Sequence, residues 1–299
     1  MTCGIRQHIR LSRHTGFLIG NPGSKRFTTI YETARKIFIT HSANGLFTVA
    51  LSLFVVLGTS AGARADEADA KRLLKAMSDY LAAQKTLSFA YDATLEVVTT
   101  DEQKLAVASS GTVVLDRPDK IRATRAGGFA DVEMSFDGKT LTVLGRILNM
   151  YAQIDTPGTV DQLIDELRLK YNRPLPAADL LLTNPYDALM RDVVDVKDLG
   201  SGVIGGVECD YLAFRAKEVD WQIWIAQGER PYPCRYTITS KLLSSGPQYT
   251  IQTRDWKTGD AVAATDFSFR NTTDARKVDL KDLEGTDELP ENFVTGEAQ

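Results

Sequence analysis

The residue types that most often carry chemistry are few in this chain and unevenly distributed. All three histidines, His8, His14 and His41, lie in the first 41 residues. Without them, a Ser–His–Asp triad, a Cys–His pair or a histidine-ligated zinc site cannot be assembled in the rest of the chain. No P-loop motif is present. We therefore expect no cofactor and no metal.

Carboxylates are the remaining candidates for catalysis. Asp161 with Asp165 or Glu166 would place two acids on one predicted helix. Acids so spaced usually form a solvated face, and only a cleft that perturbs their pKa values would favour catalysis. The sequence thus assigns no catalytic residue, and a carboxylate-based hydrolase is the least favoured function.

Cys209 and Cys234 are the cysteines outside the N-terminal segment. In an oxidising compartment such a pair invites a disulfide. If Ala216 pairs with Val219, Cys209 faces Ala226. Cys234 then lies two strands away, about 9–10 Å at ~4.8 Å per strand, on the opposite face of the sheet. Disulfide Cα separations rarely exceed about 7 Å, so this register favours two free thiols.

A basic segment precedes an apolar one at the N-terminus. Residues 1–44 hold seven Lys/Arg against one acid, and the run Gly45–Gly58 carries no charge. With Ala63-Arg64-Ala65 as the cleavage site, the pattern predicts a secretory signal peptide, residues 1–65, with a long basic n-region. No Cys follows the apolar run where a lipid-modified protein would need one. We expect an exported protein that is soluble in the periplasm.

Loss of that segment makes the chain strongly acidic. It removes eight of the 35 Lys/Arg residues and one of the 39 Asp/Glu residues, which leaves 27 and 38 and a formal charge near −11. Such a surface argues against nucleic acid and anionic membranes as partners. The rest of the chain is long enough for one domain with a sizeable core.

Hydrophobic periodicity predicts the elements that must position any site. Asp66–Lys85 has the period of a helix, and Leu87–Val97 alternates as a strand with one buried face. In the stretch Gly111–Leu144, a strand ends at Arg117-Pro118 and a turn follows at Asp137-Gly138, which together predict an antiparallel meander. Further strands are expected at Lys104–Asp116, Lys120–Ala126, Asp131–Asp137, Lys139–Gly145, Asn149–Asp155, Gly206–Ala216, Val219–Ala226, Arg235–Leu243, Tyr249–Trp256 and Asp266–Arg270.

Helical pieces interrupt the strands in the middle of the chain. Thr159 with Gln162 forms a capping box for a helix that reaches about Asn172. Two short pieces follow at Ala177–Leu182 and Tyr186–Arg191. At the C-terminus, residues 279–299 hold seven acids and one lysine, which predicts an acidic, loosely held tail.

About ten to eleven strands and three helical pieces predict an α+β domain at residues 66–278. It would be one large curved antiparallel sheet with helices on its apolar face. A hollow that the helices leave under-filled would accept a ligand, whereas a plain core from the same side chains is the alternative. The candidate ligand-binding residues are apolar positions on the strands and mid-chain helices: Phe89, Tyr91, Phe136, Tyr151, Ile164, Leu167, Leu181, Trp221, Ile223 and Tyr236.

Several stretches resemble known families. Residues 111–122 with the Phe136–Leu141 hairpin and Tyr151 resemble the LolA/LolB-type lipoprotein carriers. Leu175–Leu181, Gly206–Phe214 and Asp220–Ile225 are similar to a family of predicted periplasmic proteins, a domain of unknown function in the same structural group. Tyr211 departs from that family's pattern, in which His is more common.

The resemblance implies a LolA-like half-open β-barrel with helices as plug and lid over an apolar cavity for acyl chains. The lid would be Thr159–Asn172 with Leu175–Leu182. By position, Arg117 would be the latch that holds this lid, although an ordinary pairing with Asp116 or Asp119 is equally open.

The first function that follows is a non-catalytic periplasmic carrier or binding protein for an amphipathic lipid or acylated protein. Each CH₂ that the cavity removed from water would contribute about 0.8 kcal/mol. An envelope sensor or interaction module on the same fold, with a membrane-protein partner, is the alternative.

Overall fold

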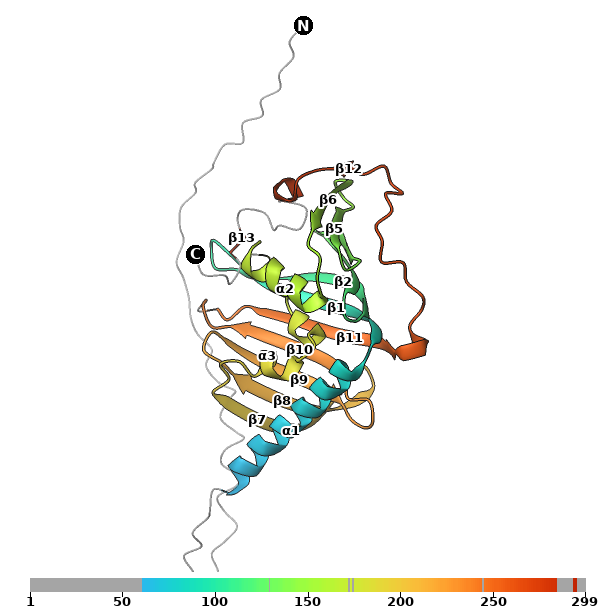
Figure 1. Cartoon of the computed structure of the whole chain (residues 1–299). Helices are drawn as coiled ribbons and strands as arrows, with labels where there is room; N and C mark the ends of the chain where they lie inside the picture. The colour runs from blue at the N-terminus through green and yellow to red at the C-terminus, as the bar shows by residue number, and fades with distance from the viewer. Residues whose placement is uncertain are drawn as a thin grey trace, which may run out of the picture. The chain divides into compact units, whose positions relative to one another are not determined.

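The computed structural model describes residues 61–128, 130–171, 173, 175–243, 245–283 and 293–294. One large sheet dominates this part of the chain, and it is curved and mostly antiparallel (Figure 1). Its strands run in the order β12-β6-β5-β4-β3-β2-β1-β11-β10-β9-β8-β7, and β13 pairs with β1 off this path. In the described residues the two end strands do not pair, so the sheet is open.

Two meanders make up the sheet and meet where β1 pairs with β11. The first contains β1 (Thr86–Thr99), β2 (Lys104–Asp116), β3 (Lys120–Gly127), β4 (Asp131–Phe136), β5 (Thr140–Gly145) and β6 (Met150–Asp155). The second contains β7 (Asp195–Ile204), β8 (Val207–Arg215), β9 (Val219–Ala226), β10 (Pro233–Ser240) and β11 (Gln248–Thr258). Two-residue strands complete the sheet at β12 (Arg276–Lys277) and β13 (Phe293–Val294).

Alternation and turn chemistry account for the first meander. In β1, Leu87, Phe89, Tyr91 and Ala93 are buried, and the residues between them are at least partly exposed. The β4–β5 turn is held by the Asp137 carboxylate, which accepts the backbone N–H of Lys139 and of Thr140. These hydrogen bonds also lower the pKa of Asp137.

Helices precede the first meander and separate the two. α1 (Ala61–Ala83) buries a stripe of residues three or four apart on the second meander and on α3. Between β6 and β7 come α2 (Val160–Leu169), the 3₁₀ turn η1 (Ala178–Leu181) and α3 (Pro185–Leu189). The predicted Thr159–Gln162 capping box is present. The 3₁₀ turns η2 (Gly259–Ala261) and η3 (Leu280–Leu283) lie near the C-terminus.

The strands predicted from the sequence differ from the observed strands in two places. β7 was not predicted, because it is an edge strand whose Leu199 and Val203 are exposed, so it lacks a clean alternation. Asp266–Arg270 is not a strand. The Asp266 carboxylate accepts the backbone N–H and the hydroxyl of Ser268, and this local turn replaces ladder hydrogen bonds.

The cysteine geometry differs from expectation in one respect. The Cys209–Ala226 pairing is present, and both cysteines are free. The register shifts between Pro233 and Arg235, however, and this irregularity brings Cys234 into one buried cluster with Cys209 and Ala226. The prediction of opposite faces is therefore wrong. Burial raises the pKa of both thiols.

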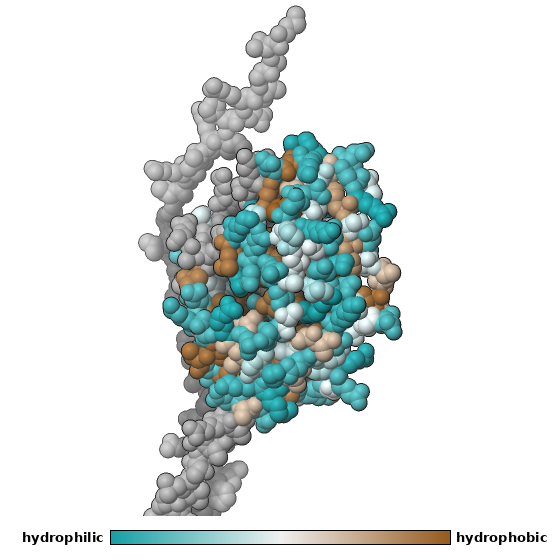
Figure 2. All heavy atoms as spheres, viewed as in Figure 1, coloured by the Kyte–Doolittle hydropathy of each residue, from teal (hydrophilic) through white to brown (hydrophobic). Residues whose placement is uncertain are grey.

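The predicted terminal segments lie largely outside the described residues. Of the expected signal peptide, only the helical backbone of residues 61–65 is described. Of the expected tail, Leu283 is buried and residues 293–294 pair with β1. Within the described residues, no helix combines the length and the apolar character needed to cross a membrane. Hydrophilic side chains predominate on the face shown in Figure 2, with apolar ones in small groups.

Candidate functional site

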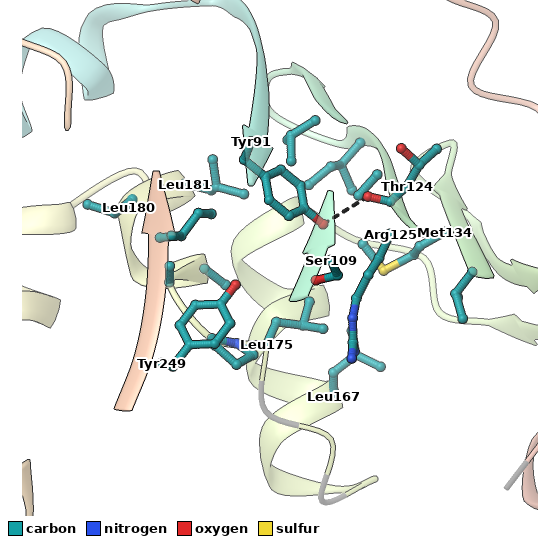
Figure 3. A pocket seen from close by; sticks show the side chains of 18 of the residues that line it. Tyr91, Ser109, Thr124, Arg125, Met134, Leu167, Leu175, Leu180, Leu181 and Tyr249 are labelled. Atoms are coloured by element: carbon teal, nitrogen blue, oxygen red, sulfur yellow. Dashed lines mark hydrogen bonds between the residues drawn. The ribbon is translucent and has the colours of Figure 1, made fainter. Parts of the chain in front are cut away.

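A cavity of about 320 Å³ lies on the concave side of the sheet, over the first meander and the adjoining strands β10 and β11. Its volume is at the lower end of the range for small-molecule sites, about 300–1,000 Å³. Figure 3 shows side chains from strands and from the covering helical segment converging on it. The strand wall comprises Phe89, Tyr91, Leu95, Val107, Ser109, Val113, Ile121, Ala123, Thr124, Arg125, Val132, Met134, Val143, Pro233, Tyr249, Ile251, Thr253 and Trp256.

The cover comes from the segment between the two meanders and from the C-terminal part of the chain. Its lining residues are Leu167, Arg173, Leu175, Pro176, Ala177, Ala178, Leu180, Leu181, Leu280 and Leu283. Among the described residues, α1, β7, β8 and β9 contribute nothing to the lining. The cavity therefore lies over the first meander and the adjoining strands β10 and β11 of the second.

A glycine makes room for the tyrosine at the centre of the strand wall. Tyr91 on β1 pairs with Gly111 on β2, and Gly111 pairs with Arg125 on β3. A side chain at position 111 would collide with the Thr124 carbonyl and with the Tyr91 ring. Because the glycine leaves this space, the Tyr91 hydroxyl donates to the Thr124 carbonyl oxygen at 2.8 Å (Figure 3).

An irregularity in β11 turns a tryptophan toward the cavity. Asp255 has a φ of 58°, and the β1–β11 register shifts beside it. Trp256 consequently stacks on Phe89 with ring centroids 4.4 Å apart, and its Nε1 donates to the Thr253 hydroxyl at 2.7 Å. Simple alternation along the strand would have pointed Trp256 to the other face.

The cover is fastened at the corner where β2 ends. The Arg117 Nε donates to the Gln84 carbonyl oxygen and its Nη2 donates to the Leu182 carbonyl oxygen, each at 3.2 Å. Arg117 thus joins the segment after α1 to the end of η1. Burial lowers the pKa of Arg117, although the nearby carboxylate of Asp161 opposes that effect.

Asp161 fastens the same corner from the first turn of α2. Its carboxylate accepts the hydroxyl of Thr183 at 2.5 Å and the backbone N–H of Thr183 at 3.1 Å. The backbone N–H of Val160 donates to the Pro118 carbonyl oxygen at 2.9 Å. The start of α2 and the end of η1 are therefore held together at one end of the cavity.

The carboxylates that the sequence offered for catalysis make no such site. Asp161 is engaged with Thr183, and Asp165 pairs with Arg168 on the surface. Hydrogen bonds from Lys170 and Thr156 lower the pKa of Glu166, which is the opposite of what a general acid needs. In the described residues, no group of His, Cys, Asp or Glu is arranged to hold a metal.

The structure divides the ten candidate ligand-binding residues. Phe89, Tyr91, Leu167 and Leu181 line the cavity. The other six do not, and most of these are buried where the core is solid: Phe136, Ile164, Trp221, Ile223 and Tyr236.

Tyr151 faces away from this core. Its ring lies against Phe269 with centroids 4.7 Å apart, whereas Ala152 is the buried neighbour on β6. The sequence analysis therefore placed Tyr151 on the wrong face of β6.

Tyr236 is a core residue. Its burial and its proximity to Asp179 raise the pKa of its phenol.

Sequence reasoning missed part of the lining. Arg125 shares a face with Ile121 and Ala123 at alternate positions of β3, a signal that was present in the sequence. Tyr249 and Ile251 alternate in the same way on β11. Leu280 and Leu283, in contrast, come from the segment expected to be a loose tail, and no periodic pattern marks them.

The comparisons with known proteins give one family match. The model of the family DUF2092, described as predicted periplasmic proteins, matches residues 70–281. No curated protein matches the chain.

Several solved structures are similar at low identity. The lipoprotein LppX of Mycobacterium tuberculosis is 12% identical over 66% of this chain and 100% of its own, with a TM-score of 0.41. LprF of Mycobacterium bovis is 12% identical over 68% and 99%, with a TM-score of 0.42. A LolA superfamily protein of Nitrosomonas europaea is 13% identical over 64% and 94%, with a TM-score of 0.30.

Proposed function

The chain belongs to DUF2092, a family of predicted periplasmic proteins, and on that premise we propose that it is a non-catalytic carrier for an amphipathic lipid or the acyl chains of a lipoprotein. The observation that carries this proposal is the apolar cavity under a cover that is fastened at one corner. Its lining is mostly aliphatic and aromatic, which suits a hydrocarbon chain.

Burial of the acyl chain would supply the binding affinity for the cargo. About ten methylenes removed from water contribute on the order of 8 kcal/mol, before the cost of ordering the chain and the protein. Such binding requires little polar recognition, so the cavity can hold cargo without a catalytic group.

In this proposal the sheet acts as a half-open barrel, α1 is the plug, and α2 with residues 175–182 is the lid. Arg117 is the latch, because its two hydrogen bonds join the end of the lid to the chain that follows α1. Opening the lid would expose apolar surface, and release would need an acceptor that covers it, such as a membrane-protein partner in the envelope.

Lipid analysis of the purified protein tests the proposal. The protein should be isolated from its native host without detergent, extracted with organic solvent and analysed by mass spectrometry. We expect acyl lipid at near-stoichiometric amounts, and we expect the stripped protein to bind the neutral dye N-phenyl-1-naphthylamine. An extract free of lipid together with no dye binding would refute the carrier function.

A further inference from the structure

The C-terminal part of the described chain closes one side of the cavity. Leu280 and Leu283 of η3 belong to its lining, and Leu283 is only 5% exposed. These leucines come after a stretch, residues 271–274, in which every residue is exposed. They belong to neither meander and to none of the helical pieces between the meanders. η3 is therefore a separate piece of the cavity wall.

η3 is attached to the sheet through a short edge strand. β12 precedes it and pairs with β6 over two residues only, and both side chains of β12 are exposed (Figure 1). The backbone N–H of Arg276 donates to the Asn149 carbonyl oxygen, and that of Val278 donates to the Tyr151 carbonyl oxygen, each at 2.9 Å. A segment joined to a sheet edge by a few exposed hydrogen bonds opens at a lower free energy than the whole fold. Residues 276–283 can thus leave the cavity while the strands of the meander stay paired.

The chain just before β12 is fixed more firmly. The Asn149 Nδ2 donates to the Thr273 carbonyl oxygen at 2.9 Å, and the Thr273 hydroxyl lies 2.8 Å from the Asn149 Oδ1 and donates to it. The Asn271 side chain accepts the backbone N–H of Ala275 and donates to its carbonyl oxygen, and Ala275 is buried. These contacts provide an anchor from which residues 276–283 can swing.

The strand register shows which edge of the first meander η3 closes. The strands from β1 to β6 are each antiparallel to the next, so β1 ends and β6 begins at the same edge. β12 pairs with the start of β6, and β13 pairs with the end of β1 at Val98 and Thr99. Arg117 follows the end of β2, where Asp116 pairs with Thr86 at the start of β1. The C-terminal chain is therefore held at the edge opposite Arg117.

The two ends of the cavity are closed in different ways. At the corner, the side chains of Arg117 and Asp161 bond the cover to the chain around it. At the opposite edge, where Leu95 and Val107 pair with each other and line the cavity, η3 adds its leucines to the wall. Opening this second end requires only that β12 leaves β6 and that the η3 leucines lose their burial.

We propose that residues 276–283 are the gate of the cavity, and that cargo enters and leaves at the meander edge opposite Arg117 when this gate swings out. This inference rests on the proposed carrier function and adds the route of entry and the element that controls it. The gate moves about the Asn149–Thr273 anchor, and the Arg117 latch keeps the other end of the cavity closed meanwhile.

The kinetics of N-phenyl-1-naphthylamine binding test the gate. In the double variant L280S/L283S the gate loses the apolar contacts that hold it shut. Burial of one leucine corresponds to at least about a tenfold change in an equilibrium, so we expect entry and release of the dye to accelerate at least about tenfold. Both rates rise together, and the equilibrium affinity changes much less than either. Stopped-flow mixing measures entry, and a chase with excess dodecanol measures release.

A second pair of leucines provides the matched control. Leu199 and Leu242 are 45% and 48% exposed, and neither lines the cavity. The variant L199S/L242S removes the same side-chain atoms, and it should leave both rates unchanged. Circular dichroism and urea unfolding verify that each variant is folded.

A disulfide between β12 and β6 should lock the gate. Arg276 pairs with Met150, and the Arg276 Nη2 lies 2.8 Å from the Met150 Sδ. Neighbouring strands are about 4.8 Å apart, within the usual Cα separation of a disulfide, about 4.4–6.8 Å. Oxidation of M150C/R276C by glutathione disulfide joins the two sulfurs and releases two molecules of glutathione, while Cys209 and Cys234 stay buried. We expect dye entry at least about tenfold slower in the oxidised form than in the reduced form of the same variant, because β12 can no longer leave β6.

The outcomes separate the gate from the carrier function. Unchanged rates in L280S/L283S, or the same acceleration in L199S/L242S, would overturn the gate and leave the carrier function standing. Equal entry rates in the oxidised and reduced forms of M150C/R276C would also overturn it. So would tighter dye binding with an unchanged release rate in L280S/L283S, since the leucines would then occupy the place of the cargo. Absence of dye binding by the parent protein would refute the carrier function itself.

Discussion

The two halves of the concave face are built from the same kind of strands, but one half is filled by side chains and the other retains a cavity. The part of the second meander formed by β7 to β9 is filled by α1, whose Ala70, Leu74, Met77 and Leu81 are fully buried. The first meander, together with the adjoining β10 and β11, is covered by α2 and an irregular segment, and this half retains a cavity of about 320 Å³.

Helix length explains much of this difference. α1 has 23 residues and is about 35 Å long at ~1.5 Å per residue, whereas α2 has 10 residues and is about 15 Å long. A long apolar stripe can follow a strand from end to end, and a short one cannot. The strand residues beyond the reach of α2 are left to the irregular segment, which packs less completely.

Aromatic rings pack against one another in both halves. On the filled half, Phe214 and Trp221 stack with centroids 3.8 Å apart, and Trp221 meets Tyr236 edge to face at 5.7 Å. On the hollow half, Phe89 and Trp256 stack with centroids 4.4 Å apart, and the Tyr91 hydroxyl donates to the Thr124 carbonyl oxygen across the wall. The comparison indicates that this sheet retains a cavity where its cover is too short to fill it.

Matched leucine truncations give the largest expected effect. Leu74→Ala on the filled half should lower the free energy of unfolding by about 2–5 kcal/mol, because it opens a new void in close-packed core. Leu167→Ala on the cavity wall should lower it by no more than about 2 kcal/mol, since that side chain already borders empty space. Urea unfolding measures both. Equal losses would remove the distinction between the halves.

Matched substitutions that enlarge a side chain should also separate the two halves. Ala70→Phe overpacks the filled half and should destabilise the fold by about 1–3 kcal/mol. Ala123→Phe projects into the cavity and should change stability by less than about 1 kcal/mol while weakening dye binding at least about tenfold. Fluorescence titration and urea unfolding report the two quantities. Full dye binding by the Ala123 variant would place the dye elsewhere.

The latch offers a smaller effect. Arg117→Leu removes the hydrogen bonds to the carbonyls of Gln84 and Leu182, and we expect a loss of about 1–3 kcal/mol in stability with faster entry of the dye. Stopped-flow fluorescence measures the entry rate. Arg72→Leu serves as the control on exposed α1 surface. An unchanged entry rate would remove the latch assignment from Arg117.

The smallest effect is a pH dependence located in the cover. Burial raises the pKa of Asp179 on η1, although Arg168 and Arg191 act in the other direction. Between the ordinary pKa and this raised value the folded state binds more protons than the unfolded state, so Asp179 weakens the fold as pH rises through that window. Asp179→Asn should therefore be more stable than the parent at pH 7, with a difference that shrinks as pH falls toward 4. Thermal unfolding across that range measures it, and a difference that grows on acidification would contradict the assignment.

Local sequence patterns were sufficient to predict the strands, turns and helix caps that depend only on residues close together in the chain. Leu87, Phe89, Tyr91 and Ala93 alternate because successive side chains of a strand point to opposite faces. Asp137-Gly138 forms its turn because the glycine adopts a φ of 93° and the aspartate accepts the following N–H groups. The capping box at Thr159 likewise needs only its own first turn.

Departures from regular alternation could not be predicted from local sequence patterns. The irregularity at Cys234 joins it to Cys209, and the one at Asp255 turns Trp256 onto Phe89. Each one reverses the face of the residues that follow it, so an alternation count carried past it assigns the wrong face. Residues such as Trp221 and Ile223 were placed on the correct face, but whether that face was filled or hollow depended on α1.

By itself, the sequence determined a curved antiparallel sheet with helices inserted in its middle, because periodicity, caps and turns act within a few residues. Only the tertiary structure decided where the hollow lies and which side chains border it. A cavity is the small difference between the volume that a sheet encloses and the volume that its cover fills, and elements from distant parts of the chain set both.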